Sequence, residues 1–426
     1  MTELHQLSAS IAAKKIQANE LTSEELVRAC IERIRDREPI TQAWVETNFD
    51  LAIQRAKYLD RSAHLGLLHG IPFGAKDLFD THDFPTRLGS AIYENNRPTS
   101  DAVHIALMRQ AGGILLGKTV TTEFATFKGG KTTNPHNPAY TPGGSSSGSA
   151  AAVADNMIPL ATGSQTAGSV IRPAAFCGVV GYKPTYGKVS LGGVKSLSPS
   201  LDTLGSFSRT VSDAALCVAA MSGDHQLAHI QPVSKRPRIA TCLTYDDKLA
   251  STETITAIHH AALLAEDMFK HQVPAIKLPP IFKDMSALQG RIMWSESARS
   301  FSYEQNNHSE QLSQQLKGLI KLGSAITYEQ YSQDLIVAEK ARATIDQLLT
   351  ESWDILITPS AIGEATHGLT QTGDPIFCRV WTLMGLPCIT LPLYTGPNRL
   401  PVGVQLVAAR GRDALLLSVA DALMQA

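Results

Sequence analysis

Two short stretches rich in glycine, serine and alanine decide the fold of this chain: residues 142–154 read PGGSSSGSAAAVA, and residues 163–178 read GSQTAGSVIRPAAFCG. The first lies in a segment, residues 129–149, whose Gly, Pro, Asn, Ser and Thr content predicts a long loop. Such composition also suits a flexible linker, but a long loop within a compact domain is more often functional. An alanine-rich helix is expected to begin at about residues 150–154.

The sequence on either side of these stretches has the pattern of an α/β protein. Residues 1–60 look helical, with a helix start at Thr22 or Ser23. Short apolar runs predict buried strands, and longer periodic segments predict two helices at 258–269 and 413–424. The predicted strands lie at 71–74, 113–117, 239–243, 355–359, 388–392 and 402–407. We find no internal repeat and predict one α/β domain over residues 1–426, with the helical segment 1–60 packed on it.

Bulk properties exclude several classes of protein. Hydrophobic residues make up 43% of the chain, charged residues 18%, and the net charge is −1, which is typical of globular proteins and counts against a nucleic-acid binder. Residues 1–15 lack the apolar part of a signal peptide, and no apolar run is long enough to predict a membrane span. Six cysteines without a C-x-x-C pair favour reduced thiols in a cytoplasmic protein. With no H-E-x-x-H pattern, we expect no metal site.

Two motif matches point to other chemistry, but their surroundings do not fit. Residues 112–119 (GGILLGKT) match the phosphate-loop pattern, yet their middle is itself an apolar strand. Residues 144–148 (GSSSG) match the esterase nucleophile elbow and nominate Ser146, but three prolines in residues 134–142 disfavour the strand that an elbow requires. We expect a helix–turn–strand joint in the first case and a loop serine in the second.

Taken together, the glycine- and serine-rich stretches resemble the core of the amidase signature family. The resemblance extends to GIPFGAKD at 70–77, GYKPTYG at 181–187 and LPVGVQLV at 400–407, and is weakest at about 225–345. It implies a central mixed β-sheet flanked by α-helices, and an amidohydrolase without a metal or organic cofactor. Position by position, Ser169 matches the nucleophile, Ser145 the bridging serine and Lys76 the base. The resemblance also implies a cis peptide bond before Ser145.

These roles suit the chemistry of the residue types. A serine hydroxyl is a poor nucleophile until a base takes its proton. Lysine can be that base only when it is neutral, so Lys76 needs burial or nearby positive charge to lower its pKa from about 10.4. Ser145 would relay the proton from the nucleophile to Lys76. Negative charge on the reacting carbonyl oxygen would be bound by backbone N–H groups in an oxyanion hole; the candidates are Thr166, Ala167, Gly168 and Ser169.

The second stretch departs from the commonest family pattern at two positions. Ala167 stands where glycine is more usual, and its Cβ is tolerated only if φ stays negative. Gln165 replaces an aspartate, a change seen in one branch of the family. Two roles are open for Arg172: a structural ion-pair partner, or a guanidinium that binds a substrate carboxylate in bidentate fashion.

Gln165 and Arg172 are similar to residues of malonamidase-type enzymes, as are TGDP at 372–375 and WTLMG at 381–385. The resemblance therefore predicts a small carboxylate-bearing amide as substrate, cleaved through an acyl-enzyme with release of ammonia or an amine. Carboxybiuret or allophanate hydrolysis and a catalytically silent binding protein stay as alternatives. So does the A subunit of a tRNA-dependent amidotransferase, although residues 377–379 lack the acidic residue expected in its glutamine pocket. We expect no direct nucleic-acid or membrane partner and leave a homodimer open.

Overall fold

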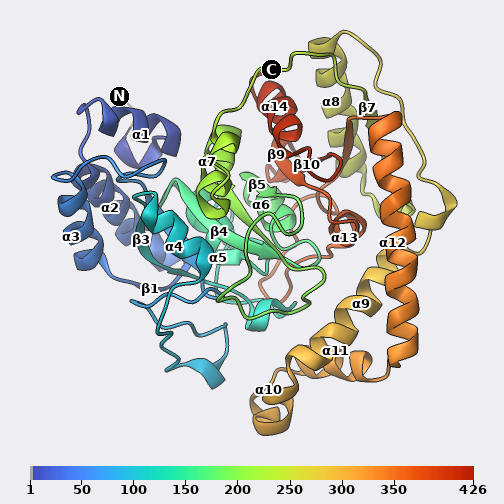
Figure 1. Cartoon of the computed structure of the whole chain (residues 1–426), viewed down its shortest axis with the longest axis horizontal. Coiled ribbons are helices and arrows are strands. Elements are labelled where there is room, and N and C mark those ends of the chain that lie inside the picture. Colours follow the sequence, from blue (N-terminus) through green and yellow to red (C-terminus); the bar gives the residue numbers. More distant parts are fainter. Residues whose placement is uncertain (1–2) are drawn as a thin grey trace.

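A ten-stranded mixed β-sheet runs through the centre of the molecule (Figure 1); the computed structural model describes residues 3–426. Strand β2 is parallel to β3 and β4, β7 is parallel to β8, and the other neighbours are antiparallel. In sheet order the strands are β1 (Trp44–Thr47), β3 (Ile114–Thr119), β2 (Pro72–Lys76), β4 (Leu160–Gln165), β6 (Thr203–Ser208), β5 (Val180–Lys183), β9 (Cys388–Thr395), β10 (Pro401–Val407), β8 (Ile355–Pro359) and β7 (Ile239–Thr241).

Helices flank this sheet, which confirms the predicted α/β fold class. Helix α5 packs on β2, β3 and β4, α6 on β5, β9 and β10, and α7 on β4, β5 and β6. Within the described residues the helices are α1 (Ala9–Gln17), α2 (Ser23–Thr41), α3 (Phe49–Leu59), α4 (Val103–Gln110), α5 (Ser147–Ala154), α6 (Ile171–Cys177), α7 (Val211–Ser222), α8 (Thr252–Phe269), α9 (Met285–Ser300), α10 (Ser302–Asn307), α11 (Gln314–Ser324), α12 (Tyr328–Glu351), α13 (Ile376–Leu383) and α14 (Asp413–Met424).

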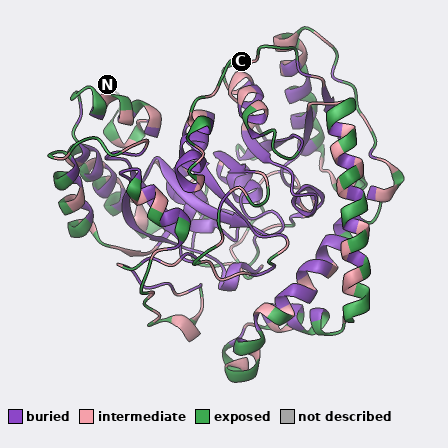
Figure 2. Ribbon diagram, in the orientation of Figure 1, coloured by how far each residue is buried: buried purple, intermediate pink, exposed green. Residues whose placement is uncertain are grey.

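The centre of the sheet is buried on both faces, as Figure 2 shows in purple. Every residue of β2, β3, β4, β5 and β6 is buried. Strands covered on both faces carry apolar or small residues without polar alternation, which explains why short apolar runs predicted β2 and β3. A charged side chain on such a strand is therefore removed from water. Lys76, on β2, is one such side chain.

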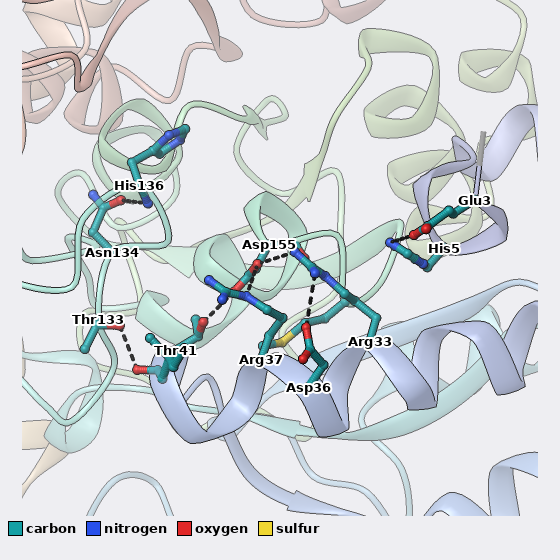
Figure 3. Close-up of polar contacts among 12 residues, drawn as sticks. Glu3, His5, Arg33, Asp36, Arg37, Thr41, Thr133, Asn134, His136 and Asp155 are labelled. Atoms are coloured by element: carbon teal, nitrogen blue, oxygen red, sulfur yellow. Dashed lines mark hydrogen bonds and ion pairs between the residues drawn. The ribbon is translucent and has the colours of Figure 1, made fainter. Parts of the chain in front are cut away.

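Helix α2 is joined by hydrogen bonds to α5, the helix that follows the glycine- and serine-rich stretch beginning at residue 142. Asp155, at the end of α5, accepts hydrogen bonds from Arg33 at 2.8 Å, Arg37 at 2.9 Å and Thr41 at 2.5 Å (Figure 3). Two arginines offset the unfavourable position of a carboxylate at a helix C-terminus. Helix α2 therefore holds α5, and with it one end of the loop. The predicted start of α2 is confirmed, with Thr22 in a capping box.

The sequence patterns missed several parts of the fold, among them the central strands β4, β5 and β6, which no apolar run marked. Strand β1 lies within the segment 1–60 that looked wholly helical, because its four residues are too few for a strand pattern to stand out. Helices α9 to α12 form an extension beside the sheet, drawn in yellow and orange in Figure 1, in the region where the family resemblance is weakest. The other predicted elements are confirmed, with changes of several residues at some ends.

Candidate active site

Lys76 lies at the carboxyl end of β2, inside the protein. Its side chain is fully buried, and Nζ lies 2.8 Å from Ser145 Oγ and 2.8 Å from Ser164 Oγ. Strands β2 and β4 are parallel, so the loop that follows Gln165 at the end of β4 leaves the sheet at the same edge. The sheet therefore brings Lys76 to the start of the segment that contains Ser169.

Burial changes the protonation of Lys76. It lowers the pKa of this amine to about 7, from an ordinary value near 10.5, because the charged form loses its hydration. The negative charge of Asp202 acts in the opposite direction and raises the pKa of Lys76. A large fraction of Lys76 is thus neutral near pH 7, which is the form that can accept a proton.

The backbone on both sides of Ser145 is held by hydrogen bonds. Arg172 Nη2 donates to the carbonyl of Gly144 at 2.7 Å, and the N–H of Thr122 donates to the carbonyl of Ser145 at 3.1 Å. The Gly144–Ser145 peptide bond is cis, as the family resemblance implied. The contacts fix the direction of the Ser145 hydroxyl toward Lys76.

In the loop of residues 166–169, side chains from elsewhere in the chain bind two of the carbonyls, and the N–H groups are free. Gln289 Nε2 donates to the carbonyl of Thr166 at 2.9 Å, and Thr382 Oγ1 donates to the carbonyl of Ala167 at 2.8 Å. In a trans peptide the N–H points opposite to the carbonyl of the preceding residue. The N–H groups of Ala167 and Gly168 are therefore aimed away from these partners. None of the four N–H groups of this loop donates to an acceptor in residues 3–426.

Ser169 closes this loop just before α6. The residue is 7% exposed, and its hydroxyl makes no hydrogen bond within the described chain, so the structure does not join it directly to Ser145. Gln165 Oε1 accepts from the N–H groups of Val170 at 2.9 Å and Ile171 at 3.0 Å. Gln165 thus occupies the first donors beyond Ser169 and leaves those of the loop unengaged. Ala167 keeps φ out of the left-handed region, as its Cβ requires.

Arg172 is buried and largely occupied by carbonyl oxygens. Besides the bond to Gly144, its Nε donates to the carbonyl of Thr372 at 2.6 Å, and Nη2 lies 3.2 Å from Thr372 Oγ1. Burial lowers the pKa of Arg172 to about 10, so it stays charged at neutral pH. It forms no ion pair within residues 3–426, and only Nη1 lacks a partner. A Cβ added to Gly168 would lie 3.2 Å from Nη1, which places this free group beside the loop.

Sequence reasoning missed the residues that support this arrangement. Asp202 is buried; it accepts from Thr166 Oγ1 at 2.5 Å and from the N–H groups of Leu197 and Ser198. Ser164, Gln289 and Thr382 contact the site from three different elements, two of them far away in the chain. Ser164 could have been noticed because it lies on β4 next to Gln165, but no local pattern marks the other two.

The two rejected motifs have structural roles. Lys118, in the phosphate-loop match, is buried on β3 and donates to the carbonyl of Phe79 at 2.7 Å, while its amine lies 3.3 Å from an Asp77 carboxylate oxygen. The match is a helix–turn–strand joint between α4 and β3, as expected. Ser146 Oγ lies 3.4 Å from the carbonyl of Ser164, and no strand leads into it. It is a loop serine.

One group of residues in the described chain has metal-like spacing, namely His82, Asp83 and Asp101. Both carboxylates are ion-paired with Arg109, at 2.6 and 3.0 Å. The group therefore has a structural explanation at the surface. Over residues 3–426, no helix combines the length and the apolar character that crossing a membrane requires.

Comparisons with known proteins agree with this architecture. The sequence profile of the family described as Amidase matches residues 25–417. The chain is 31% identical to the A subunit of the glutamyl-tRNA(Gln) amidotransferase of Endomicrobium trichonymphae, over 99% of this chain and 97% of that protein. The corresponding protein of Chloroflexus aggregans is 32% identical, over 99% and 96%.

Solved structures share the whole fold. A crystal structure of an amidase superposes with a TM-score of 0.89 at 27% identity, covering 98% of this chain and 99% of that one. The native peptide amidase of Stenotrophomonas maltophilia gives 0.83 at 27% identity, covering 99% and 96%. The chain belongs to the amidase signature family and is an amidohydrolase that acts on carbon–nitrogen bonds.

Proposed function

We propose that this enzyme hydrolyses a small, carboxylate-bearing linear amide, with Ser169 as nucleophile, Ser145 as proton relay and Lys76 as base. The observation that carries the proposal is the buried contact of 2.8 Å between Lys76 Nζ and Ser145 Oγ, at an amine whose pKa is lowered to about 7. A lysine in ordinary surroundings would be charged and unable to accept a proton. A neutral lysine in contact with a serine can serve as a general base at neutral pH.

The reaction follows from these groups. Ser169 Oγ attacks the amide carbonyl while its proton passes to Ser145 and the proton of Ser145 passes to Lys76. The oxygen of the tetrahedral intermediate carries a negative charge, and the free N–H groups of residues 166–169 bind it. When the C–N bond breaks, the proton returns through Ser145 to the leaving amine. Water then cleaves the acyl ester by the same proton path and restores the Ser169 hydroxyl.

The substrate class rests on the malonamidase-type resemblance and on Arg172. Carbonyl oxygens already occupy Nε and Nη2 of this guanidinium, the pair of nitrogens that could bind a carboxylate in bidentate fashion (the fork). We therefore give Arg172 two roles: it positions Gly144 and Thr372, and its free Nη1 offers one hydrogen bond to a substrate carboxylate. The leaving group is ammonia or a small amine. All six cysteines are free and buried, which supports a reducing, cytoplasmic setting.

A second candidate is the glutaminase component of a tRNA-dependent amidotransferase. It is favoured by the identity of about 31% to the A subunits of such enzymes along the whole chain. That activity would require partner subunits and free glutamine as the ammonia source. Carboxybiuret or allophanate hydrolysis is a third outcome that the same assay reports.

The test is ammonia release by the purified full-length chain from malonamate, malonamide, glutamine, allophanate and an aryl amide. We expect release from malonamate, abolished in Ser169→Ala and mostly retained in Ser146→Ala. The matched serine control matters because the esterase-elbow interpretation predicts the reverse. Turnover of glutamine alone, and only with partner subunits added, would favour the amidotransferase. Turnover of allophanate alone would favour the third candidate.

A further inference from the structure

A second arginine, Arg379, belongs to the helix that contacts the loop of residues 166–169. Helix α13 presents one face to this loop: a Cβ added to Gly168 would lie 2.9 Å from Pro375 Cβ and 3.1 Å from Cys378 Cβ, and Thr382 donates to the Ala167 carbonyl. Arg379 comes four residues after Pro375 and three before Thr382, so it shares this face of the helix. The helix that contacts the loop of residues 166–169 therefore carries a cation on the face that it turns toward this loop.

Helix α9 approaches the guanidinium of Arg379 from the other side. A Cβ added to Gly290 would lie 3.2 Å from Arg379 Nη1. Glycine inside a helix costs about 1 kcal/mol relative to alanine, and here its lack of a side chain leaves room for the guanidinium. The preceding residue, Gln289, donates to the carbonyl of Thr166. The Arg379 side chain thus lies between α13, which carries it, and α9, and both helices contact the loop of residues 166–169.

The charge of Arg379 is poorly neutralised by the protein. Its closest carboxylate oxygen belongs to Asp374, at 4.0 Å, and the Asp374 side chain is 53% exposed. The Arg379 side chain is only 19% exposed, and its Nε is buried without a hydrogen-bond partner in the described chain. Arg291, one residue from Gly290, differs in that it pairs with Asp334 at 2.7 Å. A mostly buried guanidinium without a close partner suits an anionic ligand.

We propose that Arg379 binds the carboxylate at the far end of the substrate and is the main residue that selects anionic over neutral amides. This deepens the proposed function and rests on it. Arg172 has only Nη1 to offer, whereas the Nε of Arg379 is free and can act together with a terminal nitrogen as a planar fork. Asp374, beside the fork, disfavours a substrate with additional negative charge at that position.

Binding to the Ser169→Ala protein tests the proposal without turnover. Malonamate, succinamate and neutral malonamide are titrated by calorimetry into Ser169→Ala alone and combined with Arg379→Gln, Arg379→Lys or Arg291→Gln. We expect Arg379→Gln to weaken the two acids by about 10- to 100-fold, the size expected for a charged hydrogen-bonded pair, and malonamide by less than about twofold. Arg379→Lys restores part of the loss because it keeps the charge but not the fork. Arg291→Gln, the matched control on α9, has no effect.

An equal loss for acids and malonamide, an unchanged affinity for the acids, or no binding of either acid to Ser169→Ala would each overturn the assignment. Failure of the proposed function looks different. In that case the wild-type enzyme releases no ammonia from these amides, while acid binding through Arg379 persists. In active enzyme, the proposal predicts that Arg379→Gln raises KM for malonamate with little change in kcat and leaves malonamide turnover unchanged.

Discussion

Replacing Ser164 with alanine tests whether Ser164 orients the amine of Lys76, the proposed base. Lys76 Nζ has two hydroxyl neighbours at 2.8 Å, Ser145 and Ser164, and burial keeps water away. A neutral amine has two N–H groups and one lone pair. With Ser164 accepting one N–H, the lone pair is free to receive the proton of Ser145. Ser164→Ala removes this acceptor, so the charged amine loses stabilisation and the lone pair loses its direction.

The magnitude follows from these contacts. A hydrogen bond to a charged group contributes about 1.5–3 kcal/mol, and about 1.4 kcal/mol corresponds to one pH unit. If Lys76 is the base, it works only when neutral, so we expect wild-type kcat/KM to rise with pH through the Lys76 pKa of about 7. The rising part of the plot of kcat/KM against pH is its acidic limb. In Ser164→Ala we expect the acidic limb to move to lower pH by about one unit. The plateau falls by about tenfold as the relay loses its alignment.

The assay is kcat/KM for ammonia release between pH 5 and 9. Ser147→Ala is the matched control, since this buried serine faces the carbonyl of Val120 at 3.4 Å and not Lys76. An unchanged limb and plateau in Ser164→Ala would refute the idea that Ser164 orients the base. A limb that moves to higher pH would refute the sign of the argument.

Three further variants test the loop of residues 166–169 and the environment of Lys76. Thr382→Val removes the donor to the Ala167 carbonyl while keeping the side-chain shape; we expect kcat to fall about tenfold with KM little changed, measured by steady-state kinetics. Asp202→Asn removes the charge that raises the Lys76 pKa, so the acidic limb moves to lower pH; a move to higher pH would contradict this. We expect Lys76→Met to abolish activity but to raise the free energy of unfolding at pH 7 by about 2 kcal/mol. The reason is that burying a lysine destabilises the fold by more than its two hydrogen bonds stabilise it. Since the folded-state pKa of Lys76 is depressed, wild type regains stability relative to Lys76→Met as pH rises from about 7 to 10.5, which urea denaturation checks.

The fold was predictable wherever local pattern and burial coincide. Strand β8 was predicted to the residue, and α14 likewise, because a short apolar run or a periodic segment is bounded by clear stop signals. Strand β1 was missed because it has only four residues and lies between two helices. The extension of α9 to α12 was missed because its helices gain stability from packing on one another, which single-sequence patterns do not reveal.

At the site, the sequence motifs predicted the residues that lie within them. They missed the residues that come from distant segments of the chain. Lys76 and Ser145 are in contact, as the family resemblance implied. Bidentate pairing by Arg172 does not agree with the structure, because the carbonyls of Gly144 and Thr372 occupy its fork. Gln289 contacts the oxyanion loop from more than 120 residues away in the chain, which no local spacing could indicate.

The most direct test of the central claim is to identify the residue that becomes acylated. The full-length protein is treated with a small fluorophosphonate, which modifies activated serines, and the labelled peptide is mapped by mass spectrometry. We predict a single adduct on Ser169, slowed at least a hundredfold in Lys76→Met and unaffected in Ser147→Ala. An adduct on Ser146, or labelling of Ser169 that does not depend on Lys76, would contradict the proposed serine–serine–lysine relay.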